Sequence, residues 1–254
     1  MVLIEHKQST EINELFKVFI EDVVVLKKLG FNPIIVHGGG KRINNKLSEV
    51  NIKSNFINGL RVTDKDTINI VEDVLIEFNK EIVEALNELD CKAKRITSKE
   101  NNIITVVQEN KDLGFVGKPT GINKEFLTEI IKANEVPVIA PLGLDKDNQT
   151  FNINADTTAG SIAIELKARR LMIISDVEGV LDSEKKLIPE INSKKANELI
   201  DQEVISGGMI PKIKNCLDVA SNGVKAVVII DGRKNHSLLF ELLSDKGSGT
   251  LIRE

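Results

Sequence analysis

The sequence predicts an α/β fold in which an open, mainly parallel sheet is sandwiched between helices, giving three αβα layers. Two observations predict it. Short apolar runs alternate with longer segments whose apolar residues recur every three or four positions, the pattern of buried strands and amphipathic helices. Segments rich in Gly, Asn and Asp follow several of the apolar runs, where parallel sheets bind ligands. We expect a single domain over residues 1–254, with lobes of roughly 1–150 and 151–254.

The first half of the chain begins with a short strand and then alternates helices and strands. Gly30 should end the first helix, because glycine is favoured just past a helix C-terminus, and Asp64 should cap a later, long helix. The predicted strands cover residues 2–4, 34–36, 103–107, 115–116 and 136–140, and the predicted helices begin at Ser9 or Thr10, at Lys41 and after Asp64.

The second half continues the alternation. A helix is expected from about Asp156 to Lys167, followed by strands at 171–175 and 226–230 and helices at 209–221 and 236–243. The carboxyl ends of parallel strands meet at one edge of a sheet. We therefore expect the polar segments 37–40, 152–156, 176–179 and 231–233 to lie along that edge.

Composition excludes several classes of function. The net charge is −4, no long basic run occurs, and Trp and Tyr are absent, so neither nucleic acid nor an anionic membrane is an expected partner. No apolar run approaches the roughly 18 residues of a membrane span, and we expect a cytoplasmic protein. Cys91 and Cys216 are interpreted as free thiols, and with only three His the sequence predicts no dedicated metal site.

The run His37-Gly38-Gly39-Gly40 is the most informative local signal. It joins a predicted buried strand to a predicted helix. Glycines at such a junction let the backbone approach a ligand and leave N–H groups unpaired at a helix N-terminus. That arrangement suits phosphate or carboxylate groups. The alternative interpretation is a tight turn without a ligand.

Two further segments carry candidate ligand-binding residues. Arg61 precedes a predicted helix cap, where its guanidinium could hold a carboxylate through two hydrogen bonds, although it could instead pair with Asp64 or Asp66 at the surface. Asn152 and Asn154 would face one side if a strand ends there, and Asp156 would begin the next helix. An N-cap is the ordinary role for such an Asp.

The remaining candidates lie in the second half. Asp176 follows a predicted strand, in a turn that could either contact a nucleotide or be only a turn. Gly207 and Gly208 lead into a helix whose early Lys212 would project toward phosphates. A lysine on an exposed helix usually faces solvent, so the neighbouring glycines carry this interpretation.

Taken together, these segments resemble the amino-acid kinase family and, within it, the acetylglutamate kinase group. The resemblance spans roughly residues 9–252 and depends on seven segments in family order: IIVHGGG, FINGLRVTD, NINAD, ISDVEGVL, ISGGMIPK, VIIDGR and GSGTLI. It implies phosphorylation of the side-chain carboxylate of N-acetyl-L-glutamate by MgATP in arginine biosynthesis, by a homodimer. A related kinase for another acylated amino acid is an open alternative.

The resemblance also implies a role for each candidate residue. Gly39 and Gly40 would lie at the phosphoryl-transfer site, and Arg61 and Asn152 would contact the amino-acid substrate. In the second lobe, Asp156 would organise the catalytic lysines, Lys212 would neutralise charge on the transferring phosphoryl group, and Asp176 and Gly208 would bind nucleotide. A γ-carboxylate with a reference pKa near ~4.3 is already ionised at neutral pH, so no general base is expected.

The first strand departs from the family pattern. There the family has a lysine followed by two glycines, whereas this chain reads Ile4-Glu5-His6-Lys7-Gln8. A second family segment is here Ile96 to Asn101 and has also lost its glycines. These departures leave a second hypothesis open: a kinase-like protein that binds N-acetylglutamate, nucleotide or a regulatory partner without efficient turnover.

Overall fold

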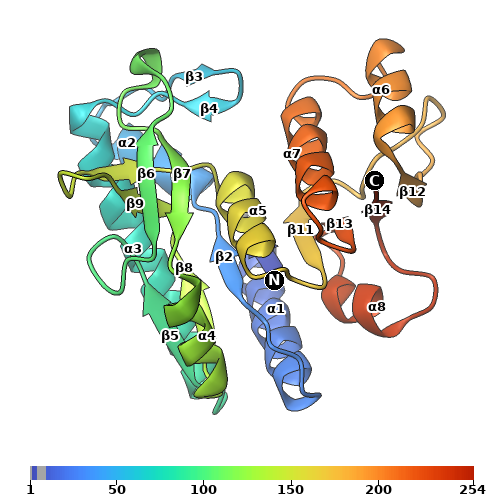
Figure 1. Cartoon of the computed structure of the whole chain (residues 1–254), viewed down its shortest axis with the longest axis horizontal. Coiled ribbons are helices and arrows are strands. Elements are labelled where there is room, and N and C mark those ends of the chain that lie inside the picture. The colour runs from blue at the N-terminus through green and yellow to red at the C-terminus, as the bar shows by residue number, and fades with distance from the viewer. Residues whose placement is uncertain (1, 5–9) are drawn as a thin grey trace.

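An eight-stranded sheet runs through the centre of the molecule (Figure 1). The computed structural model describes residues 2–4 and 10–254, with side chains from residue 14 onward. The strands lie in the order β12-β14-β13-β11-β1-β2-β8-β5, and all neighbours are parallel except β13 and β14. Their bounds are β1 Val2–Ile4, β2 Ile35–His37, β5 Ala93–Ile96, β8 Val136–Ile139, β11 Leu171–Ser175, β12 Glu190–Ile191, β13 Val227–Asp231 and β14 Thr250–Ile252.

Helices cover both faces of this sheet. One face packs against α1 (Thr10–Lys28), α3 (Lys65–Glu88) and α8 (Ser237–Leu243), and the other against α4 (Lys124–Lys132), α5 (Ala155–Glu165), α6 (Ser193–Asp201) and α7 (Met209–Ser221). Strand residues alternate between the two cores: Ile35 packs on the first and Val36 on the second. The predicted α/β fold with a mainly parallel, sandwiched sheet is confirmed.

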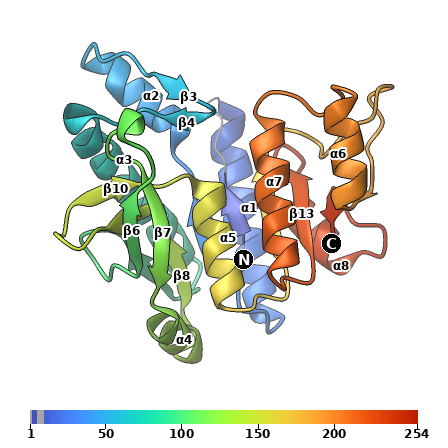
Figure 2. The same ribbon diagram turned by 45° about the horizontal axis from the view of Figure 1, so that its top comes forward.

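Two smaller sheets and the helix α2 (Gly40–Glu49) lie on the same side of the molecule, at the left of Figure 2. A four-stranded sheet has the order β10-β9-β6-β7, formed by β6 (Ile104–Gln108), β7 (Gly117–Ile122), β9 (Leu142–Leu144) and β10 (Thr150–Asn152). A hairpin of β3 (Phe56–Ile57) and β4 (Leu60–Arg61) lies near α2, and a short 3-10 helix, η1 (Lys111–Leu113), joins β6 to β7.

Side-chain hydrogen bonds at the N-termini of α3 and α5 fix where these helices begin. α3 begins where predicted, because the Asp64 carboxylate accepts a hydrogen bond from the N–H of Thr67 at 2.8 Å. α5 begins at Ala155, one residue before the predicted start, and the ordinary N-cap role is not the one that Asp156 has. Asn154, not Asp156, accepts the N–H of Thr157 at 3.0 Å. Asp156 therefore lies in the first helical turn, and its carboxylate does not cap the helix.

The predicted strand at 115–116 is also corrected. β6 and β7 do form the expected antiparallel hairpin, but β7 begins at Gly117. Phe115 and Val116 instead meet β10, where the N–H of Asn152 donates to the Phe115 carbonyl at 2.9 Å. This contact anchors the end of β10 beside the site described next. In the part of the chain described, no helix is long and apolar enough to cross a membrane.

Candidate active site

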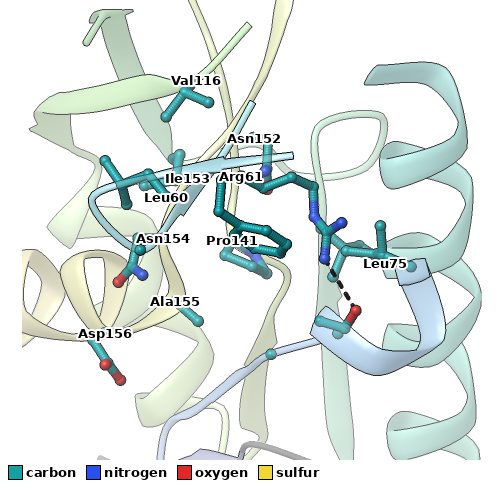
Figure 3. A pocket seen from close by; sticks show the side chains of 16 residues that line it. Leu60, Arg61, Leu75, Val116, Pro141, Asn152, Ile153, Asn154, Ala155 and Asp156 are labelled. Carbon is teal, nitrogen blue, oxygen red and sulfur yellow. Dashed lines mark hydrogen bonds between the residues drawn. The ribbon is translucent and has the colours of Figure 1, made fainter. Parts of the chain in front are cut away.

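A pocket of about 160 Å³ lies where β2, β4 and β10 end (Figure 3). Five predicted site residues line it: Gly39, Gly40, Arg61, Asn152 and Asp156. In Figure 3 Arg61 and Asp156 lie on opposite sides of the residues that line the pocket. Residues far apart in the sequence thus meet around one small cavity, because three different sheets, one holding β2, one holding β4 and one holding β10, converge there.

The two glycines at the start of α2 serve different purposes. A side chain on Gly39 would bring its Cβ within 2.6 Å of Leu75 Cδ2, so it would force Leu75 to shift where α2 packs on α3. A Cβ on Gly40 would meet nothing within 4 Å and would extend into open space at the pocket. Among the residues described, neither glycine N–H donates a hydrogen bond. The helix start is therefore available to an anion.

Arg61 is a buried cation, 8% exposed, at the other side of the pocket. Its guanidinium donates to Ser54 Oγ at 2.7 Å and to the Gly40 carbonyl at 3.1 Å, and it stacks on the Phe56 ring at 4.8 Å. Burial lowers the pKa of Arg61 from its usual value, yet an arginine stays charged at neutral pH.

The surface-pairing alternative for Arg61 is wrong. The Asp64 carboxylate caps α3, and no ion pair joins Arg61 to a carboxylate within the described ranges 2–4 and 10–254. The neutral partners fix the guanidinium without neutralising it. A buried positive charge with neutral partners favours a carboxylate ligand.

Asp156 links the pocket to the second half of the chain. Lys212 Nζ, from the first turns of α7, donates to Asp156 Oδ2 at 2.7 Å, and both side chains are largely buried, with 12% and 15% of their surface exposed. The Asn215 amide donates to the Asp156 backbone carbonyl at 3.1 Å, which further fixes α5 against α7. Lys212 is thereby held next to the pocket, although it does not line it.

Asn152 lies at the wall of the pocket, whereas the two remaining candidates, Asp176 and Gly208, lie outside it. The Asn152 amide donates to Thr63 Oγ1 at 3.3 Å at the pocket wall. Asp176 follows β11, and Gly208 is the N-cap of α7, four residues before Lys212. Neither Asp176 nor Gly208 lines the pocket, so a role for either depends on a ligand that extends along the sheet edge toward α7.

Sequence reasoning missed several residues of the site. Ser54 and Phe56 hold the Arg61 guanidinium, and Asn215 braces Asp156. Asn215 lies three positions after Lys212 on α7, so helical spacing could have indicated that they share a face. Ser54 lies in a segment without regular structure and gave no such signal.

His37 should make the stability of the fold sensitive to acid. It is fully buried, and burial lowers its pKa from 6.5 to about 4. Between these values the unfolded chain binds a proton that the folded chain does not, so stability falls as pH falls from 6.5 toward 4. We expect this residue to remove about 2 kcal/mol of unfolding free energy between pH 7 and pH 5.

Urea unfolding of the wild type and of His37→Asn at both pH values measures this effect. The variant is expected to lose that part of the pH dependence, whatever its stability at neutral pH. Equal pH dependence in the two proteins would show that the pKa of His37 does not differ between the folded and the unfolded chain.

Comparison with known proteins shows the family of the chain. The amino acid kinase family matches residues 3–231. The acetylglutamate kinase of Pelagibacter ubique (strain HTCC1062) is 98% identical over 241 residues, which cover 95% of this chain and 84% of that protein. The chain belongs to the amino acid kinase family and, within it, to the acetylglutamate kinase group.

Other similar proteins are more distant. The acetylglutamate kinase of Ruegeria pomeroyi (strain ATCC 700808 / DSM 15171 / DSS-3) is 45% identical over 242 residues, covering 95% of this chain and 84% of that protein. The crystal structure of smu.665 from Streptococcus mutans UA159 superposes with a TM-score of 0.83 at 30% identity, covering 99% of this chain and 97% of that one.

Membership in the acetylglutamate kinase group favours an enzyme over a binding protein without turnover. The segment Glu5 to Gln8, which departs from the family pattern, lies outside the described residues, so its effect stays a hypothesis. The other departing segment follows β5, where Lys99 Nζ lies 3.5 Å from both Glu72 and Asp73 carboxylates. That segment does not line the pocket.

Proposed function

We propose that the chain transfers the γ-phosphoryl group of ATP to the side-chain carboxylate of N-acetyl-L-glutamate, giving the acyl phosphate, in the arginine biosynthesis of the cytoplasm. One observation carries the proposal: a single pocket combines the buried Arg61 cation, the open helix start at Gly40 and Asp156, whose partner Lys212 lies beside the pocket. These groups suit a dicarboxylate at one end and a transferring phosphoryl group at the other.

Each residue then has a defined task. Arg61 binds the α-carboxylate, and Asn152 contacts the amino-acid substrate beside it. The γ-carboxylate oxygen attacks the γ-phosphorus while the bond to the β-phosphate oxygen breaks, and ADP leaves. Because the attacking carboxylate is already ionised, with a reference pKa near ~4.3, the residues need only position the groups and neutralise charge.

The charge on the phosphoryl oxygens is met by the backbone and by one lysine. The N–H groups of Gly39 and Gly40 bind these oxygens at the start of α2, and Lys212 approaches them from α7 while Asp156 orients it. Asp176 and Gly208 bind the nucleotide along the same edge. On this proposal residues 1–150 form the substrate lobe and residues 151–254 the nucleotide lobe.

The residues present fit MgATP through its phosphates. Gly40 and Gly208 both face open space where a phosphate chain could approach the backbone. Among the described residues, no group of three His, Cys, Asp or Glu side chains could hold a metal ion. Mg²⁺ bound to the ATP phosphates would supply further charge neutralisation when present.

An assay that traps the acyl phosphate tests the proposal directly. The purified chain is incubated with ATP, Mg²⁺ and N-acetyl-L-glutamate, and hydroxylamine converts the product to a coloured hydroxamate. We expect product only when all components are present, and less with N-acetyl-aspartate or N-acetyl-aminoadipate. Binding of both substrates by calorimetry without any hydroxamate would instead support the binding-protein hypothesis.

Gly40→Ala should lower turnover without lowering the stability of the fold. The added methyl group enters open space, and alanine is a better helix residue than glycine by up to ~1 kcal/mol, so the melting temperature should be unchanged or slightly raised. Turnover should fall at least ~10-fold, because the methyl occupies space needed by the phosphoryl oxygens. Gly121→Ala, on β7 away from the pocket, is the matched control and should keep full turnover.

We also propose a homodimer assembled through the substrate lobe. Light scattering should then give a mass of about 56 kDa, twice the 28.0 kDa of one chain. β5 lies at the end of the eight-stranded sheet and in this lobe, so it offers unpaired backbone groups to a second copy. A monomer that persists at high concentration, or a hexameric mass, would contradict this proposal.

A further inference from the structure

A buried polar pair lies directly beneath the glycine run. His37, at the end of β2, and Asn79, on α3, are both 0% exposed. The imidazole Nδ1 lies 3.0 Å from the Gly38 carbonyl oxygen, and Nε2 lies 3.2 Å from the Asn79 amide nitrogen. The ring also meets the Phe78 ring edge-on at a centroid distance of 5.1 Å. None of these contacts is explained by the phosphoryl-transfer steps above.

The neighbours of Asn79 determine which imidazole nitrogen carries the proton. The Asn79 amide nitrogen also donates to the Val138 carbonyl at 2.9 Å. Since a carbonyl oxygen only accepts, the nitrogen and not the oxygen of this amide must face Val138 and the imidazole. Its second N–H therefore points at Nε2 of His37, which must accept. The ring proton is then on Nδ1 and donates to the Gly38 carbonyl.

The opposite amide orientation is disfavoured by the same contacts. It would bring Asn79 Oδ1 against the Val138 carbonyl and leave the amide N–H groups in the position where Oδ1 now lies. That position offers no hydrogen-bond partner among the described residues, because Oδ1 itself is buried there without one. Two unsatisfied donors would replace one unsatisfied acceptor. Full burial of the ring, which lowers the pKa of His37 to about 4, keeps the imidazole neutral.

The Gly38 carbonyl matters because of the peptide to which it belongs. The carbonyl of Gly38 and the N–H of Gly39 share one planar peptide, and no described peptide bond is cis. Fixing the carbonyl direction therefore fixes the direction of the Gly39 N–H, which points the opposite way. Gly39 is the N-cap of α2, and its N–H is one of the two open donors at the pocket.

We propose that His37 and Asn79 are positioning residues for phosphoryl transfer. In this arrangement the Asn79 amide selects the Nδ1–H form of His37, and that N–H holds the Gly38 carbonyl and so aims the Gly39 N–H at the transferring phosphoryl group. The inference rests on the proposed function of the pocket, and it deepens that function by adding two residues that never touch substrate.

A matched pair of substitutions tests it. In His37→Asn the side-chain amide can place an N–H where Nδ1–H is now, whereas in His37→Gln the amide reaches the Nε2 position instead. We expect His37→Asn to keep kcat within about 3-fold, and His37→Gln to lose kcat by roughly 10- to 100-fold. KM for N-acetyl-L-glutamate should change less than about 3-fold in both, because Arg61 is untouched.

Nitrogen NMR supplies a readout independent of activity. With ¹⁵N-labelled histidine, the signals that vanish in His37→Asn belong to His37, which separates them from His6 and His236. We expect a neutral ring with Nδ1 protonated, unchanged between pH 6 and pH 8. The Gly39 amide signal should keep its wild-type position in His37→Asn and move in His37→Gln.

The outcomes are distinct. A ring protonated on Nε2 overturns the inference, and so does equal kcat in two folded variants. If His37→Gln does not fold, a loss of more than about 10-fold in kcat for His37→Asn overturns it, and a smaller loss with the expected NMR signals supports it. A wild-type chain that forms no hydroxamate would count against the proposed function, and this is measured before any variant is compared.

Discussion

Lys212→Ala is expected to lower kcat by on the order of 10²–10³-fold while KM for N-acetyl-L-glutamate changes little. Lys212 is held against Asp156 at 2.7 Å, beside the pocket and on the side opposite Arg61. It would meet negative charge that is greatest in the transition state, so its loss should appear in turnover more than in binding. Steady-state kinetics with the hydroxamate assay measures both constants.

The fold supplies a control on the same helix. Lys214 lies two residues further along α7 and is exposed, so Lys214→Ala removes the same charge from the protein without touching the pocket. We expect it to keep wild-type kcat. Lys212→Ala also leaves the largely buried Asp156 carboxylate without this partner, which should lower stability.

Asp156→Asn separates the effect of Lys212 on kcat from the effect of the broken ion pair on stability. It keeps the shape of the pair and removes its negative charge, so the cost of an unpaired buried carboxylate does not arise. If Lys212 acts on the phosphoryl group and Asp156 only orients it, this variant should lose less kcat than Lys212→Ala. Full activity in a folded Lys212→Ala would exclude the role proposed for this lysine.

Local signals predicted much of the fold because they depend on neighbouring residues alone. Asp64 was identified as a cap because an acidic side chain stood before a long amphipathic run, and its hydrogen bond to Thr67 confirms it. The strand at 171–175 was evident as a continuous apolar run, and it is buried on both faces in the structure. Such signals do not require knowledge of any distant part of the chain.

The finer geometry of the site depends on contacts between distant segments. Asp156 and Asn154 are both good N-cap residues, and the choice of Asn154 leaves Asp156 to pair with a lysine 56 positions away. The neutral partners of Arg61 come from a loop and from Gly40, 21 positions earlier. Tertiary packing decides these pairings, and no local pattern contains them.

His37 shows the same limit most clearly. As part of the HGGG run it was recognised beside a ligand-binding turn, but its contacts are internal. Its partners are the next residue, Gly38, and Asn79, which lies 42 positions away on α3. The residue type alone could not tell a buried positioning group from a catalytic base, whereas full burial and two fixed neutral partners favour the former.

Arg61→Ala is expected to weaken N-acetyl-L-glutamate binding by roughly 10- to 150-fold, corresponding to ~1.5–3 kcal/mol for a charge-assisted hydrogen bond. ATP affinity should stay nearly unchanged, since only the amino acid presents an α-carboxylate at this end of the pocket. Arg61 is 8% exposed and its guanidinium is held by Ser54, Gly40 and the Phe56 ring, so it is preorganised for a ligand carboxylate.

Two further variants make the measurement specific. Arg61→Lys keeps the charge but loses the planar fork, and should recover only part of the affinity. Lys65→Ala removes an exposed cation four residues along the chain, outside the pocket, and should bind like wild type. Calorimetry with each ligand alone separates amino-acid from nucleotide affinity. If Arg61→Ala lost affinity for both ligands equally, the guanidinium would be holding the start of α2 through its bond to Gly40, and the α-carboxylate would have to bind elsewhere.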